Sequence, residues 1–219
     1  METKALDTQQ LARELAGAMP LLTAREQRVA IALYRLLAEG RPVAPERLAE
    51  RTGIHDQEVR RLLEGWPGVY LDQAGVVGFW GLALDQMPHR LHLDGRELRA
   101  WCAWDTLFLP ELIGRPATAE STCPTTGETV SLEVVPGSGV HDVSPAGAVL
   151  SFLRREQPFD ADTIISFCHL VHFFASEEAS ADWTAKHPGT FLLSVRDGFE
   201  IGRLTNRARF AAALERSGR

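Results

Sequence analysis

The stretch Trp101-Cys102-Ala103-Trp104-Asp105 places a thiol and a carboxyl group three residues apart among large apolar side chains. A helix from Glu97 through Ile113 would put Cys102 and Asp105 near its middle, as i,i+3 neighbours on one face. Burying an acid or a thiolate without a partner costs on the order of several kcal/mol. The pair is therefore either a buried free cysteine beside a capping or ion-paired aspartate, or part of a reactive site.

The residues around this helix predict a sheet with flanking helices. Pro110 should bend the helix, and Gly114 should end it. Alternating apolar residues and turn residues predict short strands before and after it. Next come a short helix at 181–186 and a mostly helical segment at 191–214, in which two glycines weaken the helical pattern. The fold class is therefore α+β, with expected strands at 91–93, 117–122, 129–135, 140–144 and 148–154, and a strongly apolar segment at 163–175 whose residues alternate if it is a strand.

The first 85 residues predict a separate helical module. Thr23 and Glu26 have the spacing of a capping box at the head of a helix. Helices are expected around residues 11–18, 45–51 and 55–64, and from the Thr23 cap to an end at Gly40 with Pro42, followed by strands at 68–72 and 75–84. A helix, a tight turn, a helix and a hairpin form the outline of a winged helix-turn-helix. We expect a winged-helix-like N-terminal domain at 1–85 and a catalytic α+β domain, with a mixed or antiparallel sheet, at 86–219.

The charge of this module argues against DNA binding. Residues 1–80 contain ten Lys or Arg and eleven Asp or Glu. The segment that would read DNA, 55–64, has three acids against two arginines. A DNA-reading surface should be basic, so a packing or lid role is favoured over DNA binding.

Composition narrows the function classes further. The chain has 219 residues, a hydrophobic fraction of 45% and a formal charge of -6, which argues against phosphate backbones and anionic membranes as partners. No apolar run reaches the roughly 18 residues of a membrane span. The first seven residues are polar, with no signal-peptide core behind them. Three cysteines are too few for a disulfide scaffold, so we expect free thiols in the cytoplasm.

The remaining cysteines leave a metal site open. Cys123 precedes a proline in a predicted hairpin turn and is interpreted as structural. Cys168 begins the segment CHLVH, and zinc ligands could be assembled from Cys102, Cys168 and His172, although the spacing matches no known zinc motif. No motif for a nucleotide cofactor is present.

Several separated segments, in the right order, resemble the organomercurial lyase (alkylmercury lyase) family. The similarity is best over roughly residues 90–206 and looser in the N-terminal domain. It rests on Trp101 to Leu107, Leu112 to Arg115, Ser121 to Gly127, Ser166 to Ser176 and Asp182 to His187. Some members have two adjacent cysteines where this chain has Cys168-His169.

The resemblance implies protonolysis of a carbon–mercury bond, which yields a hydrocarbon and Hg(II). Carried over residue by residue, it implies that Cys102, Asp105 and Cys168 form both the catalytic set and the mercury ligands, and that Cys123 is structural. Apolar walls for the organic group are expected from Trp101 and Phe167. The family implies no required cofactor, organomercurial substrates, cytosolic thiols, and mercuric reductase as the acceptor of Hg(II). A thiol-based metal-binding or metal-sensing protein without turnover is the alternative.

Overall fold

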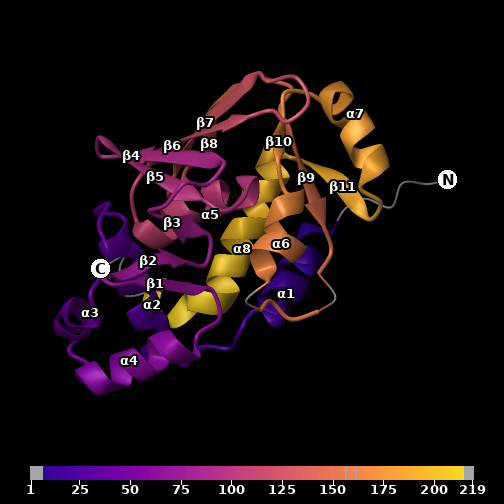
Figure 1. Ribbon diagram of the computed structural model, residues 1–219. Coiled ribbons are helices and arrows are strands. Elements are labelled where there is room, and N and C mark those ends of the chain that lie inside the picture. Colours follow the sequence, from indigo (N-terminus) through magenta and orange to yellow (C-terminus); the bar gives the residue numbers. More distant parts are fainter. Residues whose placement is uncertain (1–6, 156, 161, 215–219) are drawn as a thin grey trace.

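The computed structural model describes residues 7–155, 157–160 and 162–214 (Figure 1). An N-terminal set of helices is followed by a large antiparallel sheet, a second small sheet and a long C-terminal helix. The helices are α1 (Thr8–Ala18), α2 (Ala24–Leu37), α3 (Pro45–Thr52), α4 (Asp56–Gly65), α5 (Ala103–Ile113), α6 (Thr163–Ser166), the 3-10 helix η1 (Cys168–Leu170), α7 (Glu177–Lys186) and α8 (Val195–Leu214). The strands are β1 (Val69–Asp72), β2 (Gly75–Phe79), β3 (Leu82–Ala83), β4 (His89–Leu93), β5 (Arg96–Ala100), β6 (Ala117–Thr122), β7 (Thr129–Val135), β8 (Gly139–Ser144), β9 (Val149–Leu153), β10 (Phe173–Phe174) and β11 (Thr190–Ser194).

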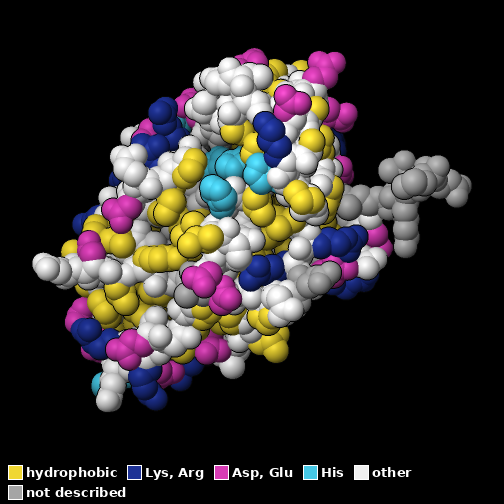
Figure 2. Space-filling model, turned by 45° about the vertical axis from the view of Figure 1, so that its right-hand side comes forward, with side chains coloured by type: hydrophobic (Ala, Val, Ile, Leu, Met, Phe, Trp, Pro, Cys, Tyr) yellow, Lys and Arg dark blue, Asp and Glu magenta, His cyan; other side chains and the backbone are white. Residues whose placement is uncertain are grey.

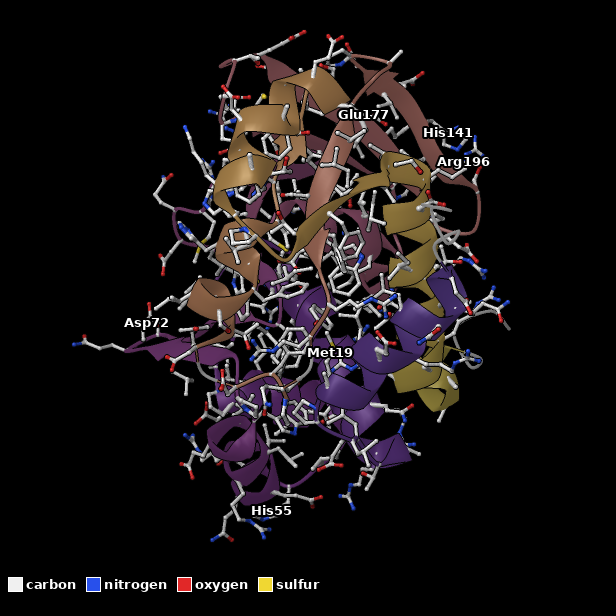
Figure 3. All side chains as sticks on the ribbon, turned by 90° about the vertical axis from the view of Figure 1, so that its right-hand side faces the viewer. Met19, His55, Asp72, His141, Glu177 and Arg196 are labelled. Atoms are coloured by element: carbon white, nitrogen blue, oxygen red, sulfur yellow. The ribbon has the colours of Figure 1, made fainter. Side chains whose placement is uncertain are left out.

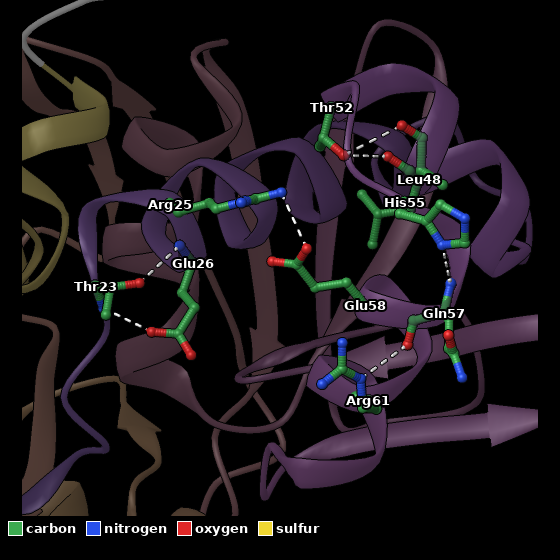
Figure 4. A network of polar contacts seen from close by, with 10 residues as sticks. Thr23, Arg25, Glu26, Leu48, Thr52, His55, Gln57, Glu58 and Arg61 are labelled. Atoms are coloured by element: carbon green, nitrogen blue, oxygen red, sulfur yellow. Dashed lines mark hydrogen bonds and ion pairs between the residues drawn. The ribbon is translucent and has the colours of Figure 1, made fainter.

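Several ends of the N-terminal helices lie at or near the residues that the sequence predicts. Thr23 and Glu26 form the expected capping box at the start of α2, with the Glu26 amide 3.3 Å from the Thr23 hydroxyl (Figure 4). Pro45 is the first residue of α3, and Gly53 ends that helix in the left-handed conformation. The expected helix-turn-helix outline is therefore confirmed. The expectation of no signal peptide concerns the N-terminus. Residues 1–6 of it lie outside the residues that the structure describes.

One eight-stranded sheet joins the helical module to the rest of the chain. Its order is β1-β2-β3-β5-β4-β6-β7-β8, and all its pairings are antiparallel. The expected strand 75–84 is broken at Trp80 and Gly81, where the chain turns back from β2 into β3. Strands β1 to β3 form the wing of the helix-turn-helix. Because β3 also pairs with β5, the wing belongs to the same sheet as strands β4 to β8. The α+β class is confirmed, while the boundary after residue 85 stays a prediction.

The helix that carries Asp105 starts later than the sequence predicted. Residues 96–100 form β5 instead, because Asp94 and Gly95 make a two-residue turn with φ of 49° and 73°, and such turns favour a hairpin. This turn pairs β5 with β4, and α5 begins only at Ala103. The expectation that Cys102 and Asp105 lie near the middle of a helix is therefore wrong: Cys102 precedes the helix and Asp105 lies in its first turn. Gly114 ends the helix as predicted.

Two later segments also differ from the prediction, and both differences come from long-range strand pairing. Residues 163–175 form α6, η1 and the short strand β10 rather than one strand, because β10 pairs with β9 for only two residues. Residues 190–194 form β11, which pairs with the other edge of β9, so α8 begins at Val195 rather than at Phe191. Neither partner strand is close in sequence, which is why local patterns did not reveal the pairing.

Helix α5 lies at the centre of the molecule and is buried on all sides. Every residue of it except Glu111 is buried. It packs along α8, where the Trp104 ring nitrogen donates to the Gly198 carbonyl at 3.0 Å and the Asn206 amide donates to the Phe108 carbonyl at 3.1 Å. Gly198 and Gly202 allow this approach. A Cβ at Gly202 would lie 2.8 Å from the Phe108 Cβ. Among the described helices, none is long and apolar enough to span a bilayer.

The contact between α5 and α8 predicts opposite effects for two Gly→Ala substitutions. Gly202→Ala improves helix propensity but forces the helices apart, so it should destabilise the protein by about 1–3 kcal/mol. Gly17→Ala, at an exposed position of α1 with no atom within 4 Å of the added Cβ, should be neutral or stabilise by up to about 1 kcal/mol. Urea unfolding at equilibrium measures both. Equal effects of the two substitutions would contradict the close packing.

Candidate active site

The first turn of α5 holds the predicted thiol and carboxyl group together. Cys102 immediately precedes the helix, and its backbone N–H donates to Asp105 Oδ2 at 2.8 Å. Because the first amides of a helix have no partner within the helix, a carboxylate in the first turn is a natural acceptor for them. Cys102 is fully buried, and Asp105 is 5% exposed. The helix start therefore fixes the direction of the carboxyl group in an almost fully buried position.

Cys168 reaches this position from a distant part of the chain. It begins η1, whose following residue, Val171, accepts a hydrogen bond from the Ala103 N–H at 3.1 Å. The buried Ser151 of β9 holds the same segment: its hydroxyl donates to the Leu170 carbonyl at 2.8 Å and accepts from the His172 N–H at 3.0 Å. These backbone contacts bring the segment after Cys168 against the start of α5.

As a result, the three predicted residues converge. The Sγ atoms of Cys102 and Cys168 and a carboxylate oxygen of Asp105 all lie within 4.8 Å of one another. Among the described residues no other group of three potential ligands meets this criterion. His172 is not part of it, so the zinc set of Cys102, Cys168 and His172 is wrong. The His172 Nε2 lies instead 2.8 Å from the His169 carbonyl.

His172 belongs to a group of rings that opens at the surface through His169, although His89 in the group is buried. Its ring centroid lies 6.2 Å from that of His89, 6.3 Å from that of His169 and 5.4 Å from that of Trp183. Figure 2 shows histidine side chains gathered amid apolar ones on one face of the molecule. This group of rings is distinct from the buried thiols.

A small apolar cavity adjoins two of the three groups, Asp105 and Cys168. Its free volume is about 20 Å³, which is room for about one water molecule. Trp101 and Phe167, the residues predicted to form the pocket, both line it and are 4% and 1% exposed. Met19, directly after α1, also lines it and lies near the middle of the view in Figure 3. Larger hollows lie elsewhere, among arginines of α2 and α3.

Burial sets the protonation states of the site. It raises the pKa of Asp105 to about 7, against the lowering effect of the hydrogen bonds from Cys102. Burial, the neighbouring Cys168 thiol and the Asp105 charge raise the pKa of Cys102 well above its ordinary value. Contact with the Cys102 thiol favours the thiolate of Cys168, but burial and the Asp105 charge outweigh it and raise that pKa too. The thiols are therefore protonated at neutral pH, and the carboxyl group exchanges protons readily.

Cys123 has a different environment. It follows β6, and its sulfur lies 3.3 Å from the Thr125 hydroxyl. Burial opposes its thiolate, but hydrogen bonds from Thr125, Thr126 and the Ala175 backbone outweigh this and lower the pKa to about 7. Thr125 in turn donates to the Ala179 carbonyl at 2.7 Å, which ties the turn to α7. The residue Cys123 is 1% exposed, which agrees with the structural role predicted for it.

Comparison with known proteins identifies the family. The model of the alkylmercury lyase family matches residues 82–206, and that of the helix-turn-helix domain of alkylmercury lyase matches residues 6–80. The chain belongs to the alkylmercury lyase family. The alkylmercury lyases of Staphylococcus epidermidis and Bacillus cereus are each 44% identical to it over 171 and 173 residues, 78% of both chains. That of Pseudomonas putida is 40% identical over 174 residues, 80% of this chain and 81% of its own.

A solved structure supports the same fold for this family member. The crystal structure of the mercury-bound form of MerB2 superposes with a TM-score of 0.69 at 23% identity, and covers 92% of this chain and 98% of its own. At this identity the likeness concerns the fold. The resemblance to alkylmercury lyases that the sequence indicated is confirmed.

Sequence reasoning missed the residues that support the site. Ser151 holds the segment after Cys168, and the glycine at 81 lies against Asp105. Neither residue belongs to a motif, and neither has a sequence spacing from the cysteines that indicates a contact. A buried serine in an otherwise apolar strand is a weak hint that its hydroxyl bonds backbone groups, but nothing in the sequence indicates which ones.

The raised pKa of Asp105 predicts a pH-dependent loss of stability. An aspartate in the unfolded chain titrates near pH 4, whereas in the folded protein the pKa is about 7. Its contribution to stability is therefore fully present below pH 4 and is lost as the pH rises through about 7. Between pH 5 and pH 8 the free energy of unfolding of the unaltered protein should fall by on the order of 3 kcal/mol more than that of Asp105→Asn, because the asparagine cannot titrate there. Urea unfolding of both proteins measures this, and parallel pH profiles would contradict it.

Proposed function

We propose that this family member is an organomercurial lyase that cleaves carbon–mercury bonds by protonolysis, with Cys102 and Cys168 as mercury ligands and Asp105 as proton donor. The observation that supports it best is the convergence of two thiols and one carboxyl group in a buried apolar site. The net reaction converts R–Hg⁺ and a proton into R–H and Hg²⁺. Mercury detoxification is the biological role that follows from this reaction.

The thiols suit the metal. Mercury(II) is a soft cation, so thiolates are its preferred ligands. Because the pKa values of Cys102 and Cys168 are raised, each thiol gives up its proton as it binds mercury rather than before. The first thiolate captures R–Hg⁺, and the second adds electron density to the metal. The bound carbon then becomes basic enough to accept a proton.

The carboxyl group suits proton transfer. Asp105 lies within reach of both sulfurs, so it takes up a proton released by a thiol and delivers it to the carbon. A carboxyl group with a pKa near 4 would hold few protons at neutral pH. At a value of about 7, Asp105 accepts and donates protons at neutral pH with similar ease, which is the condition for efficient general acid catalysis. Binding alone would need no such acid.

The cavity indicates where the organic group would bind. Trp101 and Phe167 supply apolar walls, against which the alkyl or aryl group packs while its carbon faces Asp105. The cavity has room for about one water-sized group, so an aryl substituent requires movement of the lining side chains.

The product and its partners follow from the same chemistry. Hg²⁺ stays bound to the two sulfurs until other thiols remove it, first small cytosolic thiols and then mercuric reductase. The reaction requires no cofactor, because the thiols and the carboxyl group supply all the protons and electron pairs. The protein works in the cytoplasm, where reduced thiols are abundant.

A metal-binding or metal-sensing protein without turnover is the competing function. The helix-turn-helix outline favours a sensor, but the charges on α4 do not favour DNA. The Arg60 guanidinium pairs with Asp56 and Glu46. Glu58 accepts from Arg25 at 3.0 Å, a contact drawn in Figure 4. Because α4 carries three acids against two arginines, of which only Arg61 lacks an acidic partner among the described residues, the helix offers little net positive charge for phosphates. We therefore propose neither a nucleic acid nor a membrane surface as a partner.

Turnover of phenylmercury tests the proposed function. The purified protein, incubated with phenylmercury and excess thiol, should release benzene, which gas chromatography measures. Cys102→Ser and Cys168→Ser should each be nearly inactive, because a hydroxyl is a hard ligand that does not hold mercury. Mercury binding without benzene from the unaltered protein would favour the metal-binding alternative.

Two further variants separate the roles of the acid and of the third cysteine. Asp105→Ala should bind phenylmercury but release little benzene, because the proton donor is gone. Cys123→Ser should keep benzene release near the level of the unaltered protein, with at most a loss of thermal stability. Benzene release by Asp105→Ala at the unaltered rate would remove the acid role of Asp105.

A further inference from the structure

The turn between β2 and β3 lies directly against the Asp105 carboxyl group. Gly81 has φ of +95°, a conformation that favours glycine. A Cβ at this position would lie 2.7 Å from Asp105 Cγ, 2.7 Å from Oδ1 and 3.1 Å from Cβ. Real side chains do not approach so closely, so the carboxyl group occupies the space that any side chain at residue 81 would need.

The turn cannot retreat from Asp105, because contacts on several sides fix it. The Gly81 carbonyl accepts from the Trp101 N–H at 2.9 Å. The preceding Trp80 carbonyl accepts from the hydroxyl of the fully buried Tyr34 at 3.0 Å. Trp80 itself has φ of +33°, which is unfavourable for a bulky residue and persists only where its surroundings impose it.

The carboxyl group is held from the opposite side as well. Its Oδ2 accepts the Cys102 N–H at 2.8 Å, while Oδ1 lies nearest to Gly81. Rotation or outward movement of the side chain would break the first contact or collide with the turn. The carboxyl group is thus confined between the helix start and the wing of the helix-turn-helix.

We propose that Gly81 is a positioning residue for the proton donor: its lack of a side chain sets the Asp105 carboxyl group at the distance from the two sulfurs that proton delivery requires. The inference rests on the proposed function and adds a residue to it. It also gives the N-terminal helical module a part in the reaction, since Tyr34 of α2 and the wing strands hold this turn in place.

Gly81→Ala tests the inference, with Gly95→Ala as the matched control. Gly95 also has positive φ, +73°, and lies in the turn between β4 and β5, but an added Cβ there meets nothing within 4 Å. Both variants therefore carry backbone strain, and only the first displaces Asp105. Misplacement of a catalytic group by about 1 Å lowers the rate by about 100-fold. We expect a loss of this order in the kcat of benzene release for Gly81→Ala, and a kcat near the unaltered value for Gly95→Ala.

The split between rate and affinity distinguishes positioning from a structural role. Gly81→Ala should keep its Kd for phenylmercury, measured by rapid-mixing binding before the carbon–mercury bond is cleaved, within about threefold of the unaltered protein, because both thiols remain. Equal losses in kcat and affinity, or an unaltered kcat, would overturn the inference. If the unaltered protein releases no benzene, the proposed function fails instead, so the two failures are distinguishable.

A second variant decides the question if Gly81→Ala does not fold. Tyr34→Phe removes the hydroxyl that holds the Trp80 carbonyl and leaves the turn freer to move. Its kcat should fall several-fold while its Kd for phenylmercury stays unaltered. A folded Tyr34→Phe protein with unaltered kcat would overturn the inference.

Discussion

One backbone hydrogen bond, from Ala103 N–H to the Val171 carbonyl, is the contact on which the site depends. It ties the start of α5 to the segment that follows Cys168. Cys102 lies directly before Ala103, and Cys168 lies three residues before Val171, so the contact brings both cysteines to the same place. Ser151 reinforces the contact from β9. A metal site made this way needs no local motif, because the fold itself brings the ligands together.

Burial gives the assembled groups their chemistry. The Asp105 carboxyl group has the Cys102 N–H as a backbone partner and otherwise lies among apolar walls, so burial moves its pKa to about 7. Water would stabilise the carboxylate and lower that value. The same burial keeps both thiols protonated until a soft metal displaces the protons. The protein therefore accepts a less stable core at this position, a common feature of catalytic sites.

The sequence predicted features that local interactions decide and missed those that depend on distant partners. The capping box at Thr23 and the helix end at Gly114 were correct, because each is encoded within a few residues. The helix start was wrong, because β5 forms only by pairing with its neighbours in the sheet. By propensity, Gly198 and Gly202 weaken a helix, whereas in the fold they let α8 approach α5. Cys102, Asp105 and Cys168 were found together through family resemblance, since their spacing predicts a contact only between the first two.

The coordination of bound mercury tests the central claim most directly. X-ray absorption at the mercury edge, on protein loaded with one equivalent of Hg²⁺ in thiol-free buffer, counts the sulfur neighbours of the metal. The convergence of Cys102 and Cys168 predicts two sulfur neighbours in the unaltered protein and in Cys123→Ser, and one in Cys168→Ser. A single sulfur neighbour in the unaltered protein, or an unchanged spectrum in Cys168→Ser, would contradict the account.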